Sequence, residues 1–465
     1  MVSLFPKIGK KSLHFFYVCD NIYTMKRKIT GQLEAWKNKK NRKPLILQGA
    51  RQVGKTYSLK EFGENYFSTY HYINFEEDEQ VRRIFAEDLN PRRIIEELNF
   101  YLNSSIDIEH DLLIFDEIQY CPRALTSLKY FSEKFPRLAV CSAGSLLGLY
   151  FGLTSFPVGQ VHFLSMYPMS FPEFLLGSGE EQSYDFLVQC RLGTRIPEVI
   201  HSRLWKLLKI YLITGGLPGV VEIYRDNKDD LFEALQMVRD KQKDLILAYE
   251  ADIAKHSGKQ NSMHINRLWR NIPAQLAKEQ NGSAPKFKFK GVIPGIKGYP
   301  RLSGIIDWLT TAGLVIKTNI INCGRLPFTA FAEENFFKLY FFDIGILGAI
   351  SKLSPKTILD YQYGTYKGYF AENYAAQEFI CSGVDELFCW REGAAEVEFV
   401  REVEGKIIPI EIKSGWVTQS KSHKVFARKY SPDYRVLMSA NNLQIDSENK
   451  IHRYPLYLAS CFPLL

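Results

Sequence analysis

Short apolar runs divide the first third of the chain into segments of strand length and helix length. Four of these runs have the length and residue types of buried strands: residues 44–48, 71–75, 112–115 and 138–142. Segments of mixed polar and apolar positions separate them, and residues 57–66 form the clearest helix among these segments. Because strands alternate with helices, the pattern predicts a parallel sheet with helices on both faces, which is a three-layer α/β fold.

The middle of the chain has a helical pattern. Residues 204–213 and 231–249 are the clearest helices, and Gly215-Gly216-Leu217-Pro218 predicts a helix end followed by a turn. Further on, the pattern predicts two helices and then a strand: residues 265–278, 304–312 and 315–321. This order of elements favours a winged helix-like unit.

Strict alternation returns near the C-terminus. Isoleucines occupy every second position from 408 to 412, and polar residues or proline lie between and after them. The run is therefore predicted to be a strand with one apolar and one polar face. Pro409 has no N–H to donate to a ladder, so we expect the strand to be bulged or partly unpaired at this residue. A helix over residues 366–380 precedes this region, and a helix over 419–429 and a strand over 435–439 follow it.

A second strand, over residues 396–400, is joined to the first through a turn at Glu404-Gly405. If these two residues form the whole loop of a hairpin, Glu398 faces Glu411 and Glu396 faces Lys413. Facing residues lie about 5 Å apart, where two carboxylates repel each other unless a cation lies between them.

The first apolar run is followed by a complete phosphate-binding motif. The sequence GxxxxGK[ST] is occupied by Gly49, Ala50, Arg51, Gln52, Val53, Gly54, Lys55 and Thr56. In such a loop, backbone N–H groups surround the phosphates, the lysine neutralises the β- and γ-phosphates, and the hydroxyl binds Mg²⁺. The motif lies between a predicted strand and a predicted helix, which is the setting that it requires. The sequence therefore predicts that ATP binds here with Mg²⁺.

Acidic and hydroxyl groups at the ends of two later strands complete the predicted ATP site. Asp116 and Glu117 follow the run 112–115, where the aspartate would hold Mg²⁺ and the glutamate would polarise the attacking water. Ser142 ends the next strand and could sense the γ-phosphate, although a plain strand end is an equally good interpretation. We expect Glu117 and Lys55 to be the catalytic residues of the ATPase.

Carboxylates and a lysine on the C-terminal hairpin predict a second site. Glu398 and Glu411 would bind Mg²⁺, Glu372 on the preceding helix would complete the metal site, and Lys413 would orient or activate water. This chemistry is typical of a metal-dependent phosphodiesterase. The alternatives are a surface hairpin with solvated charges and a nuclease fold that serves only as a binding module.

The predicted winged helix-like unit contains an alternation of lysines and phenylalanines over residues 286–290. Together with Lys297 and Arg301, this stretch could contact DNA phosphates and stack on bases, which suggests residues 286–301 as a DNA-binding surface. A half-buried strand with lysines on its exposed face would give the same alternation.

Composition sets limits on the environment. The formal net charge is +8, which permits contact with nucleic acid without requiring it. The eight cysteines are scattered without CxxC or Cys/His spacing, and no apolar run reaches the roughly 18–20 residues of a membrane span. We therefore expect a cytoplasmic protein, and we expect the folded part to begin near Met25 after an extension over residues 1–24.

The combination of motifs resembles a family of prokaryotic AAA-type P-loop ATPases with a C-terminal domain of uncharacterised function. The matching stretches are residues 48–56, 116–119, 167–174, 214–218, 370–373 and 410–414. The resemblance implies a helical lid beside the nucleotide, and the C-terminal arrangement resembles the PD-(D/E)xK nuclease fold in its αβββαβ order. Two residues depart from these patterns: Gln160 stands where the family usually has arginine, and Glu398 stands where such nuclease sites usually have aspartate.

These observations predict an ATP-binding and ATP-hydrolysing switch that acts on DNA and carries a nuclease-like domain. A non-cleaving ATP-dependent regulator or scaffold is the alternative. Protein remodelling would require ring assembly and a pore loop, and neither is visible in the sequence. The expected divisions are an extension (1–24), an AAA-type P-loop ATPase domain (25–165), a helical lid (166–260), a winged helix-like domain (261–330) and a nuclease-like domain (331–465).

Overall fold

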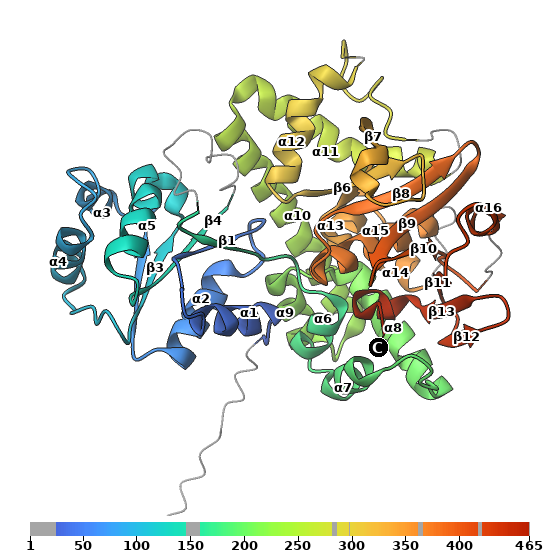
Figure 1. Ribbon diagram of the computed structural model, residues 1–465, viewed down its shortest axis with the longest axis horizontal. Coiled ribbons are helices and arrows are strands. Elements are labelled where there is room, and N and C mark those ends of the chain that lie inside the picture. Colours follow the sequence, from blue (N-terminus) through green and yellow to red (C-terminus); the bar gives the residue numbers. More distant parts are fainter. Residues whose placement is uncertain are drawn as a thin grey trace, which may run out of the picture.

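The computed structural model describes residues 25–145, 159–280, 286–296, 298–360, 366–416 and 421–464. The expected extension over residues 1–24 and the expected DNA contact at Lys297 lie outside the described residues. Two sheets organise the described part, with a parallel sheet at one end of the molecule and a larger mixed sheet at the other (Figure 1). A group of helices connects them.

The first sheet is parallel, as the sequence predicts. Its strands in spatial order are β2 (Tyr70–Asn74), β3 (Leu112–Asp116), β4 (Ala139–Gly144), β1 (Leu45–Gln48) and β5 (His162–Ser165). The helices of this unit are α1 (Lys28–Lys37), α2 (Lys55–Tyr66), α3 (Glu79–Ile84), α4 (Pro91–Leu102) and α5 (Pro122–Lys134). The mixed α/β architecture with a parallel sheet is therefore confirmed.

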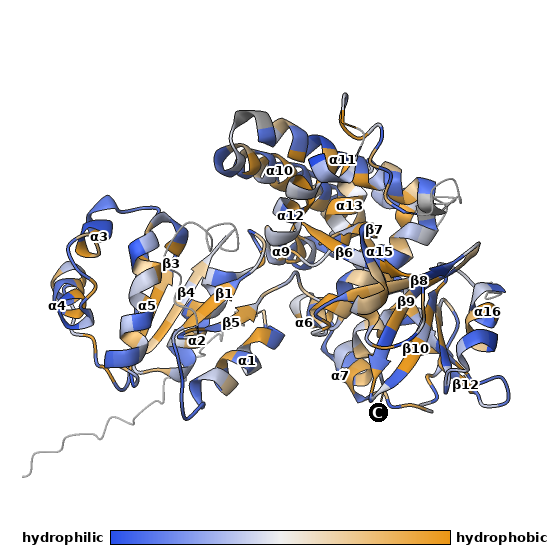
Figure 2. Cartoon of the chain, turned by 45° about the horizontal axis from the view of Figure 1, so that its top comes forward, coloured by the Kyte–Doolittle hydropathy of each residue, from blue (hydrophilic) through white to orange (hydrophobic). Residues whose placement is uncertain are grey.

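Alternation along the strands explains the three layers. Leu112 and Ile114 of β3 pack in the same core as α1 and α2, whereas Leu113 and Phe115 pack in a separate core with α3, α4 and α5. Successive side chains of a strand point to opposite faces, so a fully apolar strand needs a helical layer on each side. The strands β1, β3 and β4 are accordingly dominated by apolar residues (Figure 2).

Helices fill the space between the two sheets. They are α6 (Phe171–Gly177), α7 (Glu181–Gln189), α8 (Glu198–Thr214), α9 (Pro218–Asn227), α10 (Leu231–Ser257), α11 (Lys259–Gln280) and α12 (Ser303–Thr311). The expected break at residues 215–218 separates α8 from α9. In the described part of the chain, no helix is both long enough and apolar enough to cross a membrane.

The second sheet has eight strands. In spatial order they are β12 (Gln444–Asp446), β13 (Ile451–Pro455), β11 (Arg435–Ser439), β10 (Lys406–Ile412), β9 (Ala395–Val403), β8 (Leu387–Glu392), β6 (Val315–Ile321) and β7 (Ala332–Phe341). The associated helices are α13 (Ile344–Ile350), α14 (Pro355–Leu359), α15 (Tyr366–Cys381) and α16 (Lys421–Tyr430). The order α15, β8, β9, β10, α16, β11 is the expected αβββαβ order.

Strand β6 differs from its predicted role as part of a winged helix-like unit. It pairs in parallel with β8 and antiparallel with β7, so it is an internal strand of the C-terminal sheet. The domain boundary expected at residue 330 lies inside the β6–β7 hairpin. A local pattern predicts that a strand forms but does not identify the strand beside it, and here the partner is β8, which is distant in sequence.

The β9–β10 hairpin has the predicted register. Lys406 pairs with Val403, and the register continues without a shift to Ile410 opposite Phe399. Glu404 and Gly405 form the turn with φ angles of 51° and 77°, as a two-residue hairpin of the favoured type requires. No bulge forms at Pro409, which stays paired with Val400 on the β9 side, but the strand is partly unpaired there on its other side. The ladder with β11 on the other side of β10 begins at Ile410, one residue after the proline.

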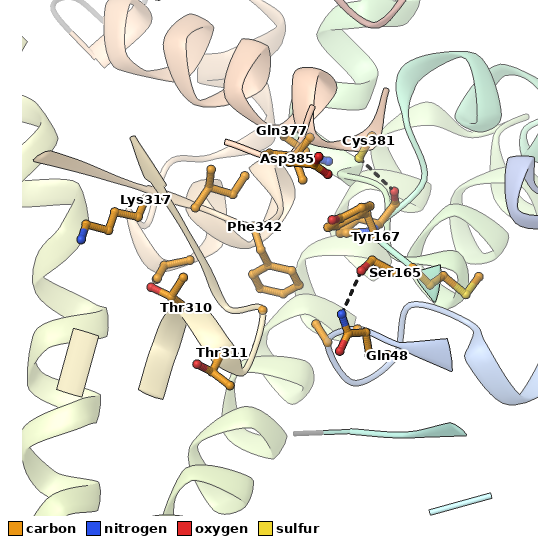
Figure 3. Close-up of a pocket in the computed structure, with 18 of the residues that line it drawn as sticks. Gln48, Ser165, Tyr167, Thr310, Thr311, Lys317, Phe342, Gln377, Cys381 and Asp385 are labelled. Carbon is orange, nitrogen blue, oxygen red and sulfur yellow. Dashed lines mark hydrogen bonds between the residues drawn. The ribbon is translucent and has the colours of Figure 1, made fainter. Parts of the chain in front are cut away.

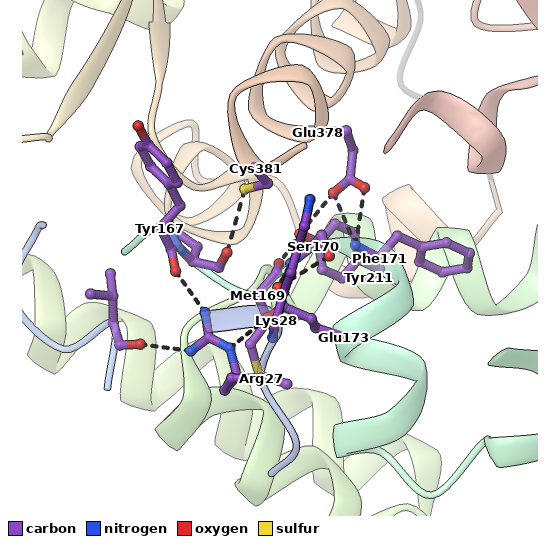
Figure 4. Close-up of polar contacts among 12 residues, drawn as sticks. Arg27, Lys28, Tyr167, Met169, Ser170, Phe171, Glu173, Tyr211, Glu378 and Cys381 are labelled. Carbon is purple, nitrogen blue, oxygen red and sulfur yellow. Dashed lines mark hydrogen bonds and ion pairs between the residues drawn. The ribbon is translucent and has the colours of Figure 1, made fainter. Parts of the chain in front are cut away.

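Helix α15 is bound to the backbone that follows β5 (Figure 4). Both carboxylate oxygens of Glu378 accept hydrogen bonds from the N–H of Phe171, at 3.0 and 3.1 Å. Gln377 donates to the Tyr211 hydroxyl at 2.8 Å, and Tyr211 in turn donates to the carbonyl oxygen of Met169 at 2.5 Å. These groups are buried, so a connection between the two sheet-containing units depends on hydrogen bonds that have no access to solvent.

A second buried junction is formed at the turn before α9. Asp343 accepts a hydrogen bond from the N–H of Gly216 at 2.7 Å, and Met169 donates its N–H to the carbonyl oxygen of Gly216 at 2.6 Å. A Cβ atom on Gly215 would overlap the Asp343 carboxylate, and one on Gly216 would overlap the backbone of Met169. The glycine pair therefore permits three chain segments to approach more closely than any side chain would allow.

Glu378 makes folding stability depend on pH. Burial raises the pKa of Glu378 from 4.5 to about 8, and the hydrogen bond from Phe171 offsets only part of this shift. The folded state therefore favours the protonated form. The stability from this group is complete below pH 4.5 and is lost as pH rises to about 8, by at most about 1.4 kcal/mol per pH unit.

We expect Glu378→Gln, which is neutral at every pH, to flatten this decline between pH 5 and 8. Urea unfolding at several pH values measures the slope. Glu386→Gln is the control, because Glu386 is exposed shortly after the same helix. If the slopes of wild type and Glu378→Gln are the same, Glu378 does not cause the decline.

Candidate functional site

The predicted phosphate loop connects β1 to α2 and has an unusual backbone. Gly49, Gln52 and Gly54 have φ angles of 153°, 66° and 97°. Gly49 also lies against the carbonyl oxygen of Met166, where a Cβ atom would overlap it. The two glycines suit these conformations, whereas the left-handed conformation of Gln52 is not evident from the sequence pattern. The loop therefore follows the curved path that a phosphate-binding backbone requires.

Lys55 is the first residue of α2, and its side chain lies inside the loop. The Nζ atom donates hydrogen bonds to the carbonyl oxygens of Gly49 at 3.0 Å and Ala50 at 2.8 Å. Burial lowers the pKa of Lys55 to about 8, although the nearby carboxylates of Glu117 and Asp116 oppose this shift. The ammonium group is thus held at the centre of the loop by acceptors that phosphate oxygens can replace.

Thr56 and Asp116 meet as predicted. The Thr56 hydroxyl donates to Asp116 Oδ2 at 2.7 Å, and the Tyr72 hydroxyl donates to the same oxygen at 2.9 Å. Tyr72 lies on β2 and was not predicted, because a tyrosine in a strand carries no signal of this contact. The pairing of Thr56 with Asp116 brings together two oxygen groups that suit Mg²⁺ beside a triphosphate.

Glu117 follows β3, and Ser142 lies inside the neighbouring strand β4, two residues before its end. Glu117 has a φ angle of 48°, and its Oε2 accepts hydrogen bonds from Gln119 Nε2 and from the Ser145 hydroxyl. A positive φ is uncommon for a residue other than glycine and persists where surrounding contacts enforce it. The Ser142 hydroxyl is buried and has no hydrogen-bond partner. An unsatisfied buried hydroxyl supports the sensor interpretation of Ser142 over that of a plain strand end.

Gln160 lies at the amino ends of the parallel strands, whereas the phosphate loop lies at their carboxyl ends. It precedes β5 and accepts a hydrogen bond from Ser132, while the carbonyl oxygen of Gly159 accepts one from Lys43, just before β1. The phosphate loop follows the carboxyl end of β1, so the whole length of the strand separates the two places. A side chain at position 160 therefore does not reach the ATP site of its own chain.

Two further segments contact the loop, and neither contact was predicted. Arg27 donates to the carbonyl oxygens of Val53 and Tyr167, both at 2.8 Å, and forms an ion pair with Glu173 at 2.9 Å (Figure 4). On another side, Arg51 forms an ion pair with Asp252 of α10. Sequence patterns give no indication of these partners because 146 and 201 residues separate the members of the two ion pairs.

A cavity of about 740 Å³ lies between the loop and the C-terminal unit (Figure 3). Gln48 and Ser165 line it from the parallel sheet, joined by a hydrogen bond of 3.1 Å, and Lys317, Phe342 and Asp385 line it from the C-terminal unit. Lys55, Thr56, Asp116 and Glu117 do not line this cavity. It is therefore separate from the phosphate-facing side of the loop.

The predicted C-terminal cluster also forms. Lys413 Nζ lies 2.5 Å from Glu411 Oε1 and 3.8 Å from Glu398 Oε1. Burial and the adjacent Glu411 carboxylate raise the pKa of Glu398 well above its ordinary value. Burial opposes protonation of Lys413, but the charges of Glu398 and Glu411 outweigh it and raise the pKa of this lysine. Oε2 of Glu411 is buried without a hydrogen-bond partner.

A second lysine, which the sequence analysis did not identify, completes the cluster. Lys338 of β7 is buried and forms ion pairs with Glu396 at 2.5 Å and Glu372 at 3.4 Å. The Tyr340 hydroxyl also donates to Glu372, at 2.9 Å. The expected pairing of Glu396 with Lys413 is therefore replaced by ion pairs with Lys338 and with Arg391, which faces Glu396 across the β8–β9 ladder. The cause is a cation that reaches Glu396 from a strand 58 residues earlier in the chain.

The fit of this cluster to a metal ion is partial. In the described ranges, no group of three or more His, Cys, Asp or Glu side chains is arranged to hold a metal ion. Each carboxylate that was expected to bind the metal already forms an ion pair with a lysine. Lys413 pairs with Glu398 and Glu411, and Lys338 pairs with Glu372. The unpartnered oxygen of Glu411 is the one buried atom here that a cation would satisfy. Metal binding would thus require Lys413 to move aside.

The phenylalanines of residues 286–290 are not available to stack on bases. Phe287 is buried, donates its N–H to the carbonyl oxygen of Phe337, and packs against the Phe337 ring, as does Phe289. Lys288 and Lys290 are exposed. The alternation is that of a half-buried segment, so any contact of this segment with DNA would involve the lysines alone.

We expect Lys338→Met to destabilise the protein by about 3 kcal/mol, because the change leaves the buried carboxylate of Glu372 without its cation and leaves Glu396 with Arg391 alone. Urea unfolding at pH 7 measures this loss. Lys406→Met is the control, since Lys406 pairs with Asp433 at the surface and little change is expected. Equal unfolding midpoints for Lys338→Met and wild type would show that the buried ion pairs do not contribute to stability.

Comparisons with known proteins support part of this assignment. Residues 41–175 match the model of an AAA domain family, whereas residues 206–357 and 367–458 match two families described as domains of unknown function. The match over 206–357 crosses the boundaries expected at residues 260 and 330. No curated protein matches the chain.

Several solved structures show a distant likeness. A Walker-type ATPase of Pyrococcus abyssi is 15% identical, covers 70% of this chain and 96% of its own, and has a TM-score of 0.45. The Orc1 protein of Aeropyrum pernix in complex with DNA is 14% identical, with 70% and 91% coverage and a TM-score of 0.24. PCH-2 of C. elegans is 10% identical, with 46% and 67% coverage and a TM-score of 0.27. These scores are too low to add to the assignment.

The AAA family match covers β1 to β5, the phosphate loop and the acidic pair. The chain therefore carries an AAA-type ATPase domain, the kind of domain that binds and hydrolyses ATP.

Proposed function

We propose that the chain is an ATP-driven switch that binds ATP with Mg²⁺ at Gly49–Thr56, Asp116 and Glu117. The observation that carries the proposal is the contact between Thr56 and Asp116 beside a loop that holds Lys55 at its centre. On this proposal, backbone N–H groups of the loop and Lys55 bind the phosphates, and Thr56 and Asp116 hold the Mg²⁺ that neutralises their charge. Glu117 orients the attacking water, and the free hydroxyl of Ser142 contacts the γ-phosphate.

The contacts of α10 and α15 support a role as a switch. Helix α10 reaches the phosphate loop through Asp252, and α15 holds the backbone after β5 through Glu378. Helix α15 also carries Glu372, a member of the C-terminal cluster. A change in the loop on ATP binding would therefore reach elements that contact the C-terminal sheet.

We expect Glu117→Gln to lower kcat for ATP hydrolysis by about 10²–10³-fold while ATP binding is retained, because the amide cannot polarise water as a carboxylate does. Lys55→Ala should instead weaken ATP binding by at least about 10-fold. Phosphate release and calorimetric titration measure the two effects. Lys134→Ala, an exposed lysine at the end of α5, is the control. Unchanged hydrolysis and binding in both site variants would exclude this loop as the ATP site.

We propose as a second function that the C-terminal cluster cleaves phosphodiester bonds in DNA with Mg²⁺. Support comes from the meeting of Glu398, Glu411 and Lys413 and from the unpartnered oxygen of Glu411. Mg²⁺ would supply charge neutralisation of the phosphate, and Lys413 would orient water. The exposed Lys288 and Lys290 and the basic net charge are compatible with a polyanion partner. One observation supports the alternative, a non-cleaving regulator or scaffold: lysines already neutralise the carboxylates of the cluster.

We expect wild-type protein to nick supercoiled plasmid in the presence of Mg²⁺ or Mn²⁺, and Lys413→Ala to lower the rate by at least about 100-fold. Agarose gels of plasmid and linear DNA, with and without ATP, measure cleavage. Lys406→Ala is the matched control, because Lys406 begins β10, the strand that Lys413 follows, and pairs with an exposed aspartate. If protein that hydrolyses ATP leaves all DNA intact, the non-cleaving alternative is supported.

A further inference from the structure

Arg51 is a cation inside the phosphate loop that is bound by a helix outside the AAA domain. Its guanidinium forms an ion pair with Asp252 of α10, and its carbonyl oxygen accepts a hydrogen bond from the Tyr249 hydroxyl at 2.9 Å. The side chain of Arg51 remains 38% exposed. Helix α10 thus contacts the backbone and the side chain of one loop residue, and the side chain is accessible enough to change partner.

The charges around Arg51 are those of the ATP site. The carboxylates of Glu117 and Glu76 act on Arg51 in addition to Asp252, and the charge of Arg51 in turn acts on Lys55. Arg51 therefore lies within electrostatic reach of the residues that contact the transferred phosphate on the proposed function. Guanidinium groups bind phosphate oxygens through two parallel hydrogen bonds, which gives them an advantage over lysine at such a site.

The end of α10 also contacts the segments that follow the next two strands. Lys255 forms an ion pair with Glu76, after β2, at 2.8 Å, and lies 4.7 Å from the ring centre of Tyr120, which follows β3 and Glu117. Together with Asp252, these contacts place one helix end against three loops at the carboxyl edge of the sheet. Earlier in the same helix, the Tyr249 ring packs against Phe342, beside the C-terminal sheet.

Other arginines are less suited to this role. Gln160 occupies the position at which the sequence resemblance implied an arginine, and that position is at the far edge of the sheet. Arg123 donates to the carbonyl oxygens of Phe85 and Glu87, which follow α3. Arg51, by contrast, belongs to the loop itself.

We propose that Arg51 exchanges Asp252 for the γ-phosphate when ATP binds, and that this exchange both stabilises the transition state and releases α10. The inference rests on the proposed ATP site. A triphosphate brings several negative charges to the loop, so it competes with the single carboxylate of Asp252. ADP lacks the γ-phosphate and leaves Arg51 paired with Asp252. The ion pair therefore makes α10 sensitive to the difference between ATP and ADP.

The first test compares Arg51→Ala, Arg51→Lys and Asp252→Asn in the full-length protein. For Arg51→Ala we expect kcat to fall about 100-fold and the preference for a non-hydrolysable ATP analogue over ADP to fall about 10-fold, with ADP affinity nearly unchanged. Arg51→Lys should recover part of kcat and part of the preference for the analogue. Asp252→Asn should bind the analogue more tightly than wild-type protein, because Arg51 is no longer paired with a carboxylate in that variant. Loss of ATP and ADP affinity in equal proportion would overturn the proposal, since it would indicate a structural role only.

Glu250→Gln is the matched control. Glu250 lies on α10 two residues before Asp252 and forms its own ion pair with Arg270 of α11, so its loss perturbs the helix without affecting Arg51. We expect wild-type kinetics for this variant. If Glu250→Gln and Asp252→Asn have the same effect, the result reflects general loosening of α10 and contradicts a specific exchange.

Hydrogen exchange in residues 249–257 provides a second readout that does not depend on turnover. The analogue should increase exchange in wild-type protein, whereas ADP should not, and Arg51→Ala should lose the difference between the two nucleotides. An identical response to both nucleotides in wild-type protein would overturn the release of α10. Lys55→Ala tests the proposed ATP site separately from the release of α10. If Lys55→Ala binds nucleotide as wild-type protein does, ATP binds elsewhere and the proposed site is wrong.

Discussion

The hydrogen bond from the N–H of Phe171 to the buried carboxyl group of Glu378 ties the unit of the parallel sheet to the C-terminal unit. Phe171 begins α6 shortly after β5, and β5 pairs with β1, the strand that ends in the phosphate loop. Only a short stretch of structure, through β1, β5 and Phe171, therefore connects the phosphate loop to Glu378 of the C-terminal unit. Because a buried N–H without an acceptor is costly, the contact is directional and resists sliding in a way that apolar packing does not.

Helices α15 and α10 both contact the AAA domain, and they do so with different chemistry. Helix α15 uses buried, largely neutral hydrogen bonds, which favour a single arrangement. Helix α10 uses the partly exposed ion pair of Arg51 with Asp252, and such pairs contribute little to stability and exchange partners readily. A protein with one fixed connection and one exchangeable connection can transmit the state of a nucleotide without separating its parts.

Local chemistry accounts for what was predictable from the sequence. The strands, the phosphate loop and the Thr56–Asp116 contact follow from a continuous motif and a strand pattern, and the β9–β10 register follows from a two-residue turn. The failures that changed the interpretation of a site or a domain involve partners that are distant in sequence. The alternation at residues 286–290 fits a DNA-binding surface and a half-buried segment equally well, and only the position of Phe337 distinguishes them. Lys338 took the place of Lys413 beside Glu396 for the same reason.

The close approach of chain segments at Gly215, Gly216 and Gly345 has a consequence for how this protein can evolve. A Cβ atom at Gly345 would meet Gln242 and the backbone of Thr214, just as Cβ atoms at the other two glycines would meet Asp343 and Met169. These overlaps involve mainly backbone or buried groups, which cannot move aside. Selection should therefore remove substitutions of these three glycines, even if many positions in both sheets tolerate substitution. At these positions, the two units cannot change their sequences independently of each other.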